Sequence, residues 1–422
     1  MALVSDGVRR QKPRIVIVGA GPAGLAAAIA TAQELPRAAI TVLEQRSNLD
    51  ATAVKADATF RETFERKNVL QANLYTLHQL ERLGALGRLT LLKGLQRFKS
   101  IELNDVRSSP DSPRKTYNIE HESKLANLDA FETASATAVL GSNLTQHVCG
   151  IPIASLQQAL FATAVHQGII FVFDSGKVTV ERDAEIGARV RYTSRDGEPL
   201  SDQADLLIIA EGTGRSITQQ DLNIEPDVKS ERQHFLYSFL ISNDIGPRIF
   251  YNRKRSNDPA IEFSGCAIVS NTASEVGTIF YVQIPRPLKQ DERSRREALE
   301  EELQVMREVF RDHLDSKAIS IDDTVPITQF SVEVSSLPVY SIDDNIIVGD
   351  AARTGHFNSG AAFSVSLVCD INTVRQLVRK VFKNLIDGTA DSQSAFSEFN
   401  DALSQASTEL HNMELAFFYE QC

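Results

Sequence analysis

Three closely spaced glycines near the start of the sequence follow a run of branched apolar residues. Residues 15–18, Ile-Val-Ile-Val, predict a buried β-strand, and the glycines come directly after it in the spacing G-x-G-x-x-G. In this spacing the glycines allow a tight turn, a close approach of the backbone to a pyrophosphate, and close packing of the next helix on the strand. The N-terminus of that helix would direct its partial positive charge toward the phosphates. The residues expected to hold a dinucleotide here are Gly19, Gly21, Pro22, Ala23 and Gly24.

A glutamate ends the next apolar run. Residues 39–43 predict a second strand, and Glu44 stands twenty residues past Gly24. An acidic side chain at this distance can bind a ribose hydroxyl of the dinucleotide. The ending Glu44-Gln45-Arg46 resembles that of FAD-binding Rossmann proteins, which implies that Gln45 and Arg46 also lie near the ligand. A glycine-rich turn without a ligand is the alternative, and the strand–turn–helix–strand context makes it the weaker one.

Two further apolar runs, residues 204–210 and 345–348, also end in residues suited to a cofactor site. Ligands of open α/β sheets bind at the carboxyl ends of the strands. The pairs expected to contact the cofactor at these ends are Glu211 with Gly212 and Gly349 with Asp350.

The segment after Asp350 is the place where we expect the chemistry. It carries His356, whose ordinary pKa of about 6.5 suits a proton donor or a hydrogen bond to substrate. A purely structural histidine is the alternative. Gly360 and Ala361 then open a long helix predicted over residues 361–385.

The elements that must position a substrate lie mainly between residues 233 and 284. Apolar runs at 234–241, 248–251, 260–269 and 277–284 predict strands. No helices separate these runs, so we expect an antiparallel sheet in a second domain. Alternation places Tyr237 and Phe239 on one face, whereas the adjacent Phe280 and Tyr281 point to opposite faces. The residues expected to line a substrate pocket are Tyr237, Phe239, Tyr281 and Phe357. Charged and amphipathic helices are predicted over 288–315 and 394–418.

Composition excludes several classes of protein. The 422 residues carry a formal net charge of −11, which argues against nucleic acid as a partner. No run is long and apolar enough for a transmembrane helix, and the first residues lack an apolar signal core. The cysteines are scattered without a C-x-x-C, so we expect reduced thiols, no metal site and a cytoplasmic location: they are Cys149, Cys266, Cys369 and Cys422.

The three strand-end signatures, taken together and in this order, resemble the FAD-dependent aromatic hydroxylases, the single-component flavin monooxygenases typified by para-hydroxybenzoate hydroxylase. The resemblance spans roughly residues 14–385. It implies an α/β fold in which a Rossmann-type FAD-binding domain is interleaved with an antiparallel substrate sheet and followed by C-terminal helices. The implied ranges are 14–97, 149–220 and 340–385 for the FAD-binding domain, 98–148 and 221–339 for the sheet domain, and 386–422 for a C-terminal helix.

The resemblance also implies roles for single residues. The glycine turn would hold the FAD pyrophosphate, Glu44 the adenosine ribose, and Arg46 the adenine side. Asp350 would bind the ribityl chain, and the amides at Gly360 and Ala361 would face the pyrimidine edge of the flavin and stabilise negative charge there.

The sequence departs from the family pattern at several points. The usual Asp-Gly pair is Glu211-Gly212, and Ser216 lies one residue later than usual. Arginines common in the family would fall at Ile153 and Tyr75. The proline usual in front of the flavin is absent, with Phe357 nearest. These differences indicate an atypical member, such as an enzyme of secondary metabolism.

The activity implied by the resemblance is that of a monooxygenase. NADPH or NADH would reduce FAD without a second dinucleotide fold, and the sequence has no second G-x-G-x-x-G. Reaction with O2 would then hydroxylate or epoxidise a small organic substrate. The alternatives are an FAD-dependent reductase or dehydrogenase, a halogenase, which the absence of tryptophan disfavours, and a redox-neutral, cyclase-like FAD protein. Substrate identity, nicotinamide preference and oligomeric state stay open.

Overall fold

The computed structural model describes most of the chain. The described residues are 12–46, 69–105, 114–118, 131, 135–140, 147–183, 187–194, 196–241, 248–253, 265–269, 278–288, 291–314, 319–356, 360–383 and 392–416. Phe357, one of the expected pocket residues, lies outside them.

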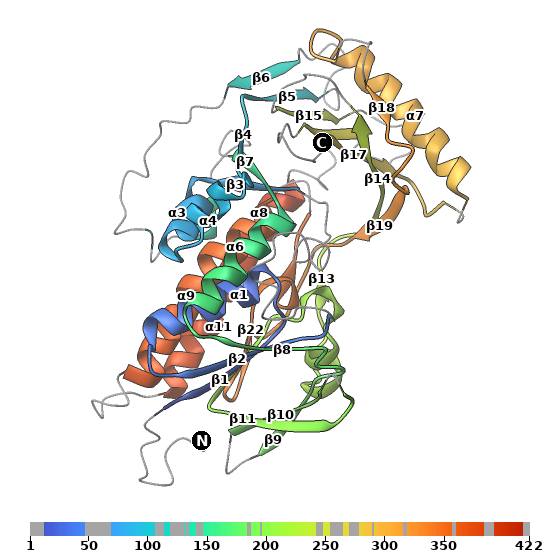
Figure 1. Cartoon of the computed structure of the whole chain (residues 1–422). Coiled ribbons are helices and arrows are strands. Elements are labelled where there is room, and N and C mark those ends of the chain that lie inside the picture. Colours follow the sequence, from blue (N-terminus) through green and yellow to red (C-terminus); the bar gives the residue numbers. More distant parts are fainter. Residues whose placement is uncertain are drawn as a thin grey trace.

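A parallel sheet forms the centre of the lower part of the molecule in Figure 1. Its strand order is β21-β22-β12-β1-β2-β8, and all neighbours are parallel except β21 and β22. The bounds are β1 (Arg14–Val18), β2 (Ala39–Glu44), β8 (Ile170–Phe173), β12 (Leu206–Ile209), β21 (Ser341–Ile342) and β22 (Asn345–Ile347). Every residue of β12 and β22 is buried, which explains why these strands are continuous apolar runs. The predicted Rossmann-type order of strand, glycine turn and helix is confirmed.

Helices pack on this sheet and against one another. Figure 1 shows α1, α6, α9 and α11 side by side, with α3 and α4 above them. Their bounds are α1 (Pro22–Glu34), α3 (Leu74–Arg82), α4 (Leu86–Leu91), α5 (Ala136–Leu140), α6 (Ile153–His166), α8 (Ala361–Val365), α9 (Ile371–Val378) and α11 (Ser392–Glu414). The long helix expected from residue 361 is present, but π-helical turns at 366–370 and 379–383 interrupt its α-helical parts.

A second, large sheet lies at the top of Figure 1. Its order is β18-β14-β17-β16-β15-β5-β6, and β19 pairs with β14. The bounds are β5 (Ser100–Asp105), β6 (Lys115–Asn118), β14 (Gln233–Ile241), β15 (Arg248–Arg253), β16 (Gly265–Val269), β17 (Thr278–Ile284), β18 (Ser320–Ile321) and β19 (Thr328–Val332). Helix α7 (Glu292–Val309) covers one face, where its apolar residues pack with Phe280. Tyr281 packs with the opposite cluster, as alternation predicts.

The antiparallel pairing expected for the strands between residues 234 and 284 is confirmed, and one further pairing of this sheet, which the sequence did not predict, is parallel. β5 and β15 run parallel, with Ser100 opposite Arg248 and Asp105 opposite Arg253. A tight hairpin forces antiparallel pairing, and these two strands come from segments far apart in the sequence, so no hairpin dictates their direction.

Three small sheets complete the described structure. Their strand orders are β11-β10-β9, β3-β7-β4 and β13-β20-β23. In the last of them, β13 and β20 come from the range predicted for the sheet domain, and β20 pairs with residues 353–354, which follow Asp350. The bounds are β3 (Val69–Asn73), β4 (Gln96–Arg97), β7 (His147–Pro152), β9 (Thr179–Asp183), β10 (Gly187–Thr193), β11 (Pro199–Ala204), β13 (Asp227–Val228), β20 (Ser335–Ser336) and β23 (Arg353–Thr354). Across the described ranges, every helix is too short or too polar to span a bilayer.

Candidate functional site

The glycine turn between β1 and α1 is built by close backbone approaches. A Cβ on Gly19 would lie 2.3 Å from the carbonyl oxygen of Ala210, and a Cβ on Gly24 would lie 2.0 Å from that of Gly19. Gly19 also has a φ of +104°, which side-chain-bearing residues rarely adopt. The first and third glycines are therefore required by the fold itself.

Gly21 differs from its two neighbours. A Cβ there would meet nothing within 4 Å, so the turn leaves open space in front of Gly21. Gly21 is the N-cap of α1, no side chain caps this helix, and its first turn has no acidic residue. An uncapped helix N-terminus with room in front of it suits a phosphate group.

Glu44 ties the end of β2 to this turn. Its carboxylate accepts hydrogen bonds from the Ala20 amide at 2.8 Å and from the backbone and guanidinium of Arg46 at 2.9–3.1 Å. Burial alone would raise the pKa of Glu44, but the hydrogen bonds and charge of Arg46 outweigh it and lower the pKa. The carboxylate is therefore ionised at neutral pH and can accept a further hydrogen bond from a ribose hydroxyl.

The turn at Gly349 and Asp350 packs directly against the glycine turn. Gly349 has a φ of +67°, and a Cβ there would lie 2.6 Å from Cβ of Ala23. Two of the three sequence signatures, more than 300 residues apart, thus meet at one point. The side chain of Asp350 is exposed, as a residue that receives ligand hydroxyls must be.

Arg215 connects the loop after β12, which carries the Glu211-Gly212 signature, to the turn at Asp350. Its guanidinium donates to the carbonyl oxygens of Ala351 at 3.0 Å and Asp350 at 3.3 Å, and to the Ser335 hydroxyl at 3.1 Å. Burial lowers the pKa of Arg215, while the carboxylates of Asp350 and Glu333 oppose the shift. The loop after β12 therefore holds the backbone of the Asp350 turn.

Glu211 has a local role. Its carboxylate accepts from the backbone amides of Ile217 and Thr218 at 2.9 Å and from the hydroxyls of Ser216 and Thr218 at 2.8–2.9 Å. These bonds satisfy the first amides of the helical turn at 217–221. The residue shapes the loop that carries Gly212 and Arg215.

A buried ion pair lies behind the Asp350 turn. Asp370 accepts from the Gly349 amide at 2.9 Å and from Nη1 of Arg353 at 2.7 Å, and both side chains of the pair have zero exposure. Burial lowers the pKa of Arg353, but the charge of Asp370 more than offsets this, so its pKa lies above the ordinary value. Asp370 thereby connects the long helix to the turn.

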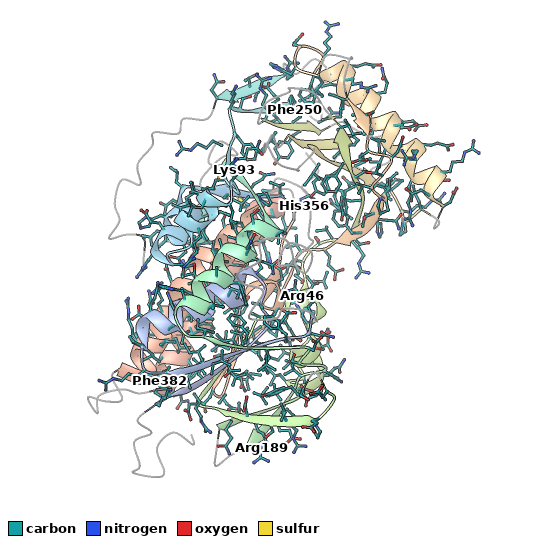
Figure 2. The ribbon with its side chains drawn as sticks, viewed as in Figure 1. Arg46, Lys93, Arg189, Phe250, His356 and Phe382 are labelled. Carbon is teal, nitrogen blue, oxygen red and sulfur yellow. The ribbon has the colours of Figure 1, made fainter. Side chains whose placement is uncertain are left out.

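His356 links the loop after Asp350 to the large sheet. It is buried, its Nε2 lies 3.1 Å from Oε1 of Gln233, and its ring meets that of Phe235 edge-on with centroids 5.5 Å apart. Figure 2 shows His356 at the junction of the upper sheet and the lower helices, with Arg46 below it near the end of β2.

Aromatic side chains continue from Phe235 along β14. Tyr237 lies 6.4 Å from Phe239 and 5.8 Å from Tyr281, measured between ring centroids, and Phe330 of β19 lies 5.7 Å from Tyr237. The structure therefore brings together three of the four expected pocket residues on one face of the sheet. Phe330 was missed, although its aromatic type could have marked it.

Gly360 also depends on a residue that the sequence did not reveal. It has a φ of +59°, and a Cβ there would lie 2.7 Å from the carbonyl oxygen of Gln71. The buried side chain of Gln71 donates to the hydroxyl of Tyr251 at 2.9 Å, so β3 lies between the start of α8 and the large sheet.

Comparison with protein-family models decides the class. A model described as an FAD binding domain matches residues 12–362. The chain belongs to this FAD-binding family. A comparison with curated proteins gave no match.

Solved structures show which flavoproteins share the fold of this FAD-binding protein. p-Nitrophenol 4-monooxygenase PnpA from Pseudomonas putida DLL-E4 superposes with a TM-score of 0.65 at 13% identity, over 97% of this chain and 90% of that one. 2-Methyl-3-hydroxypyridine-5-carboxylic acid oxygenase gives 0.57 at 16%, over 98% and 95%. The flavin-dependent halogenase CmlS gives 0.62 at 14%, over 96% and 63%. At these identities the likeness establishes the fold alone.

The expected resemblance to the aromatic hydroxylases is confirmed for the FAD-binding family and the fold. The geometry fits FAD: Gly21 faces open space before an uncapped helix, Glu44 is ionised beside it, and Asp350 is exposed next to Ala23.

Proposed function

We propose that this flavoprotein is a monooxygenase that uses NADPH or NADH and O2 to hydroxylate or epoxidise a small organic substrate. The substrate would be an aromatic compound or an intermediate of secondary metabolism. The observation that carries the proposal is the contact of His356 with Phe235, because it joins the loop after Asp350 to a group of aromatic side chains against which an organic ring would pack. Scattered cysteines support a cytoplasmic location.

In this proposal the chain itself binds, orients and excludes water. The first amides of α1 and the space at Gly21 hold the pyrophosphate, Glu44 accepts from the adenosine ribose, and Asp350 accepts from the ribityl hydroxyls. Gln45, Arg46 and Gly212 border the same edge of the sheet, and Gly360 and Ala361 would face the flavin pyrimidine. Bound FAD would supply hydride acceptance and activation of O2.

The large sheet would supply the dry side of the substrate pocket. Tyr237, Phe239 and Tyr281 present apolar ring faces, and a water-excluded site strengthens every electrostatic interaction in it. His356, held by Gln233, would donate a hydrogen bond or a proton to the oxygen of the substrate.

The deciding experiment is anaerobic reduction of the purified holoprotein by NADPH and by NADH, with and without a panel of phenols, aromatic carboxylates and alkenes. We expect substrate-stimulated bleaching of the flavin absorbance, followed on aeration by one oxygenated product per O2 consumed. Bleaching with saturation of an alkene and no O2 incorporation would instead identify a reductase.

Absence of bleaching with every donor and substrate would contradict the proposal. It would leave a halogenase-type enzyme reduced by a partner, or a redox-neutral FAD protein. A matched variant tests the pocket: His356→Gln should lower product formation per NAD(P)H oxidised while FAD binding stays at the wild-type level, because Gln keeps a donor near Gln233 but not the titratable ring.

A further inference from the structure

One face of the C-terminal helix α11 is polar although it is buried. Ser407, His411 and Glu414 are spaced i, i+4 and i+7, so they lie on one side of the helix. They are 2%, 4% and 0% exposed. Polar side chains at such burial are normally paired, so this polar face of α11 must have partners elsewhere in the fold.

The polar face of α11 contacts consecutive residues of the segment that follows Asp350. Ser407 Oγ accepts from Nε of Arg353 at 2.7 Å. His411 forms a hydrogen bond with the backbone of Thr354. Both carboxylate oxygens of Glu414 lie 2.7 Å from where a Cβ on Gly355 would be. Successive turns of α11 thus contact successive residues 353, 354 and 355.

The Ser407 hydroxyl uses its donor and both of its acceptor positions. Its hydroxyl accepts from Arg353 and from the Tyr340 hydroxyl, each at 2.7 Å, and donates to the carbonyl of Leu403 at 2.8 Å. Removing this one oxygen would leave two buried donors without their acceptor. Because the guanidinium of Arg353 also pairs with Asp370, which holds the Gly349 amide, α11 is connected through two side chains to the turn that bears Asp350.

His411 stands between this segment and a cavity. Burial and the nearby charge of Arg353 lower the pKa of His411 to about 4, so the ring is neutral at physiological pH and one nitrogen donates to the Thr354 carbonyl. Its Nε2 has no hydrogen-bond partner in the described part of the chain. The residue His411 borders a cavity of about 350 Å³ that is also lined by Lys229, Ser336 and Thr408.

We propose that Ser407, His411 and Glu414 are positioning residues of the FAD site, which hold residues 353–355 and so set the place of Asp350 and of the loop that carries His356. The family match ends at residue 362, so α11 lies outside the matched domain. The proposal rests on FAD binding and is independent of the reaction proposed above.

The test compares His411→Leu, His411→Asn and Ser407→Ala. Asn places an amide where the donor nitrogen of the histidine stands, whereas Leu fills the space without a donor. We expect His411→Leu and Ser407→Ala to raise the FAD dissociation constant of the apoprotein by about tenfold, and His411→Asn to stay within about threefold of wild type. Hydrogen exchange of amides 349–356, measured without FAD, should speed up in the first two variants only.

Phe399→Leu is the matched control. Phe399 is buried on the same helix, eight residues and so about 12 Å before Ser407. We expect it to lower thermal stability without changing FAD affinity or exchange at 349–356. Two outcomes would show that α11 is a structural support only. In the first, all variants lose stability alike while exchange at 349–356 and FAD affinity stay at wild-type values. In the second, Phe399→Leu changes exchange and FAD affinity as much as His411→Leu does. If His411→Leu does not fold, Ser407→Ala decides. Because the exchange readout needs neither FAD nor turnover, it separates this proposal from the proposed reaction.

Discussion

The two ends of the proposed FAD site are held by different means. The glycine turn at residues 19–24 is shaped by close backbone packing, which would bring a Cβ on Gly19 or Gly24 within 2.0–2.3 Å of a carbonyl oxygen, and by the carboxylate of Glu44. The segment at 349–356 is shaped by buried side chains from distant parts of the chain, among them Arg215, Asp370 and Ser407. The first end has little freedom to change without losing the fold, whereas the second end can be retuned by single side chains.

This difference explains where chemical diversity can arise on a shared fold. A pyrophosphate is the same in every FAD enzyme, so a backbone cradle suffices for it. The loop proposed to lie in front of the flavin must differ between reactions; in this chain it carries His356 and is supported by side chains that substitution can replace.

The largest expected effect comes from breaking the buried pair behind Asp350. Asp370→Asn leaves the buried charge of Arg353 uncompensated and should lower the free energy of unfolding by about 3–5 kcal/mol. Urea unfolding of the apoprotein measures it. The paired replacement of Arg353 and Asp370 by Leu should recover most of the loss, because no buried charge then remains. A loss below about 1 kcal/mol for Asp370→Asn would show that the segment does not depend on this pair.

The two ends also differ in how far they could be predicted. The glycine turn, Glu44 and the strand ends at 211–212 and 349–350 were identifiable because strand, turn and helix signals are local. Arg215, Asp370, Gln71 and Phe330 were not, because nothing near them in the sequence states what they contact after folding. The parallel pairing of β5 with β15 was missed for the same reason.

Gly24→Ala and Gly21→Ala separate folding from binding at the glycine end. A methyl on Gly24 must push against the carbonyl of Gly19, so we expect a loss of about 1–3 kcal/mol in the stability of the apoprotein. A methyl on Gly21 meets open space, so apoprotein stability should be nearly unchanged while FAD affinity falls about tenfold or more. Thermal unfolding and FAD titration measure the two. Equal stability losses in both variants would contradict the cradle described for Gly21.

Glu44→Gln tests the carboxylate that binds the glycine turn. Because the pKa of Glu44 is lowered in the fold, its ionisation contributes stability that is present above its ordinary value of 4.5 and is lost as pH falls through the folded value. We expect the variant to be about 1–2 kcal/mol less stable at pH 7, with the difference from wild type shrinking below pH 4.5. Urea unfolding at pH 7, 5 and 4 checks the trend. A difference that is constant over this range would mean that the charge has no part in it.

The smallest effect should come from replacing Gln157, a side chain of α6 that donates a hydrogen bond to the glycine turn. Its Nε2 donates to the carbonyl of Ala20 at 3.1 Å, and it is 2% exposed. Gln157→Leu removes one neutral hydrogen bond and should cost about 1 kcal/mol, with a change of a few-fold in FAD affinity. Thermal unfolding and FAD titration, with Leu156→Ala as a buried control on the same helix, measure both quantities. A loss as large as that of Asp370→Asn would show that the glycine end also depends on a distant side chain, and the contrast between the two ends would then be one of degree.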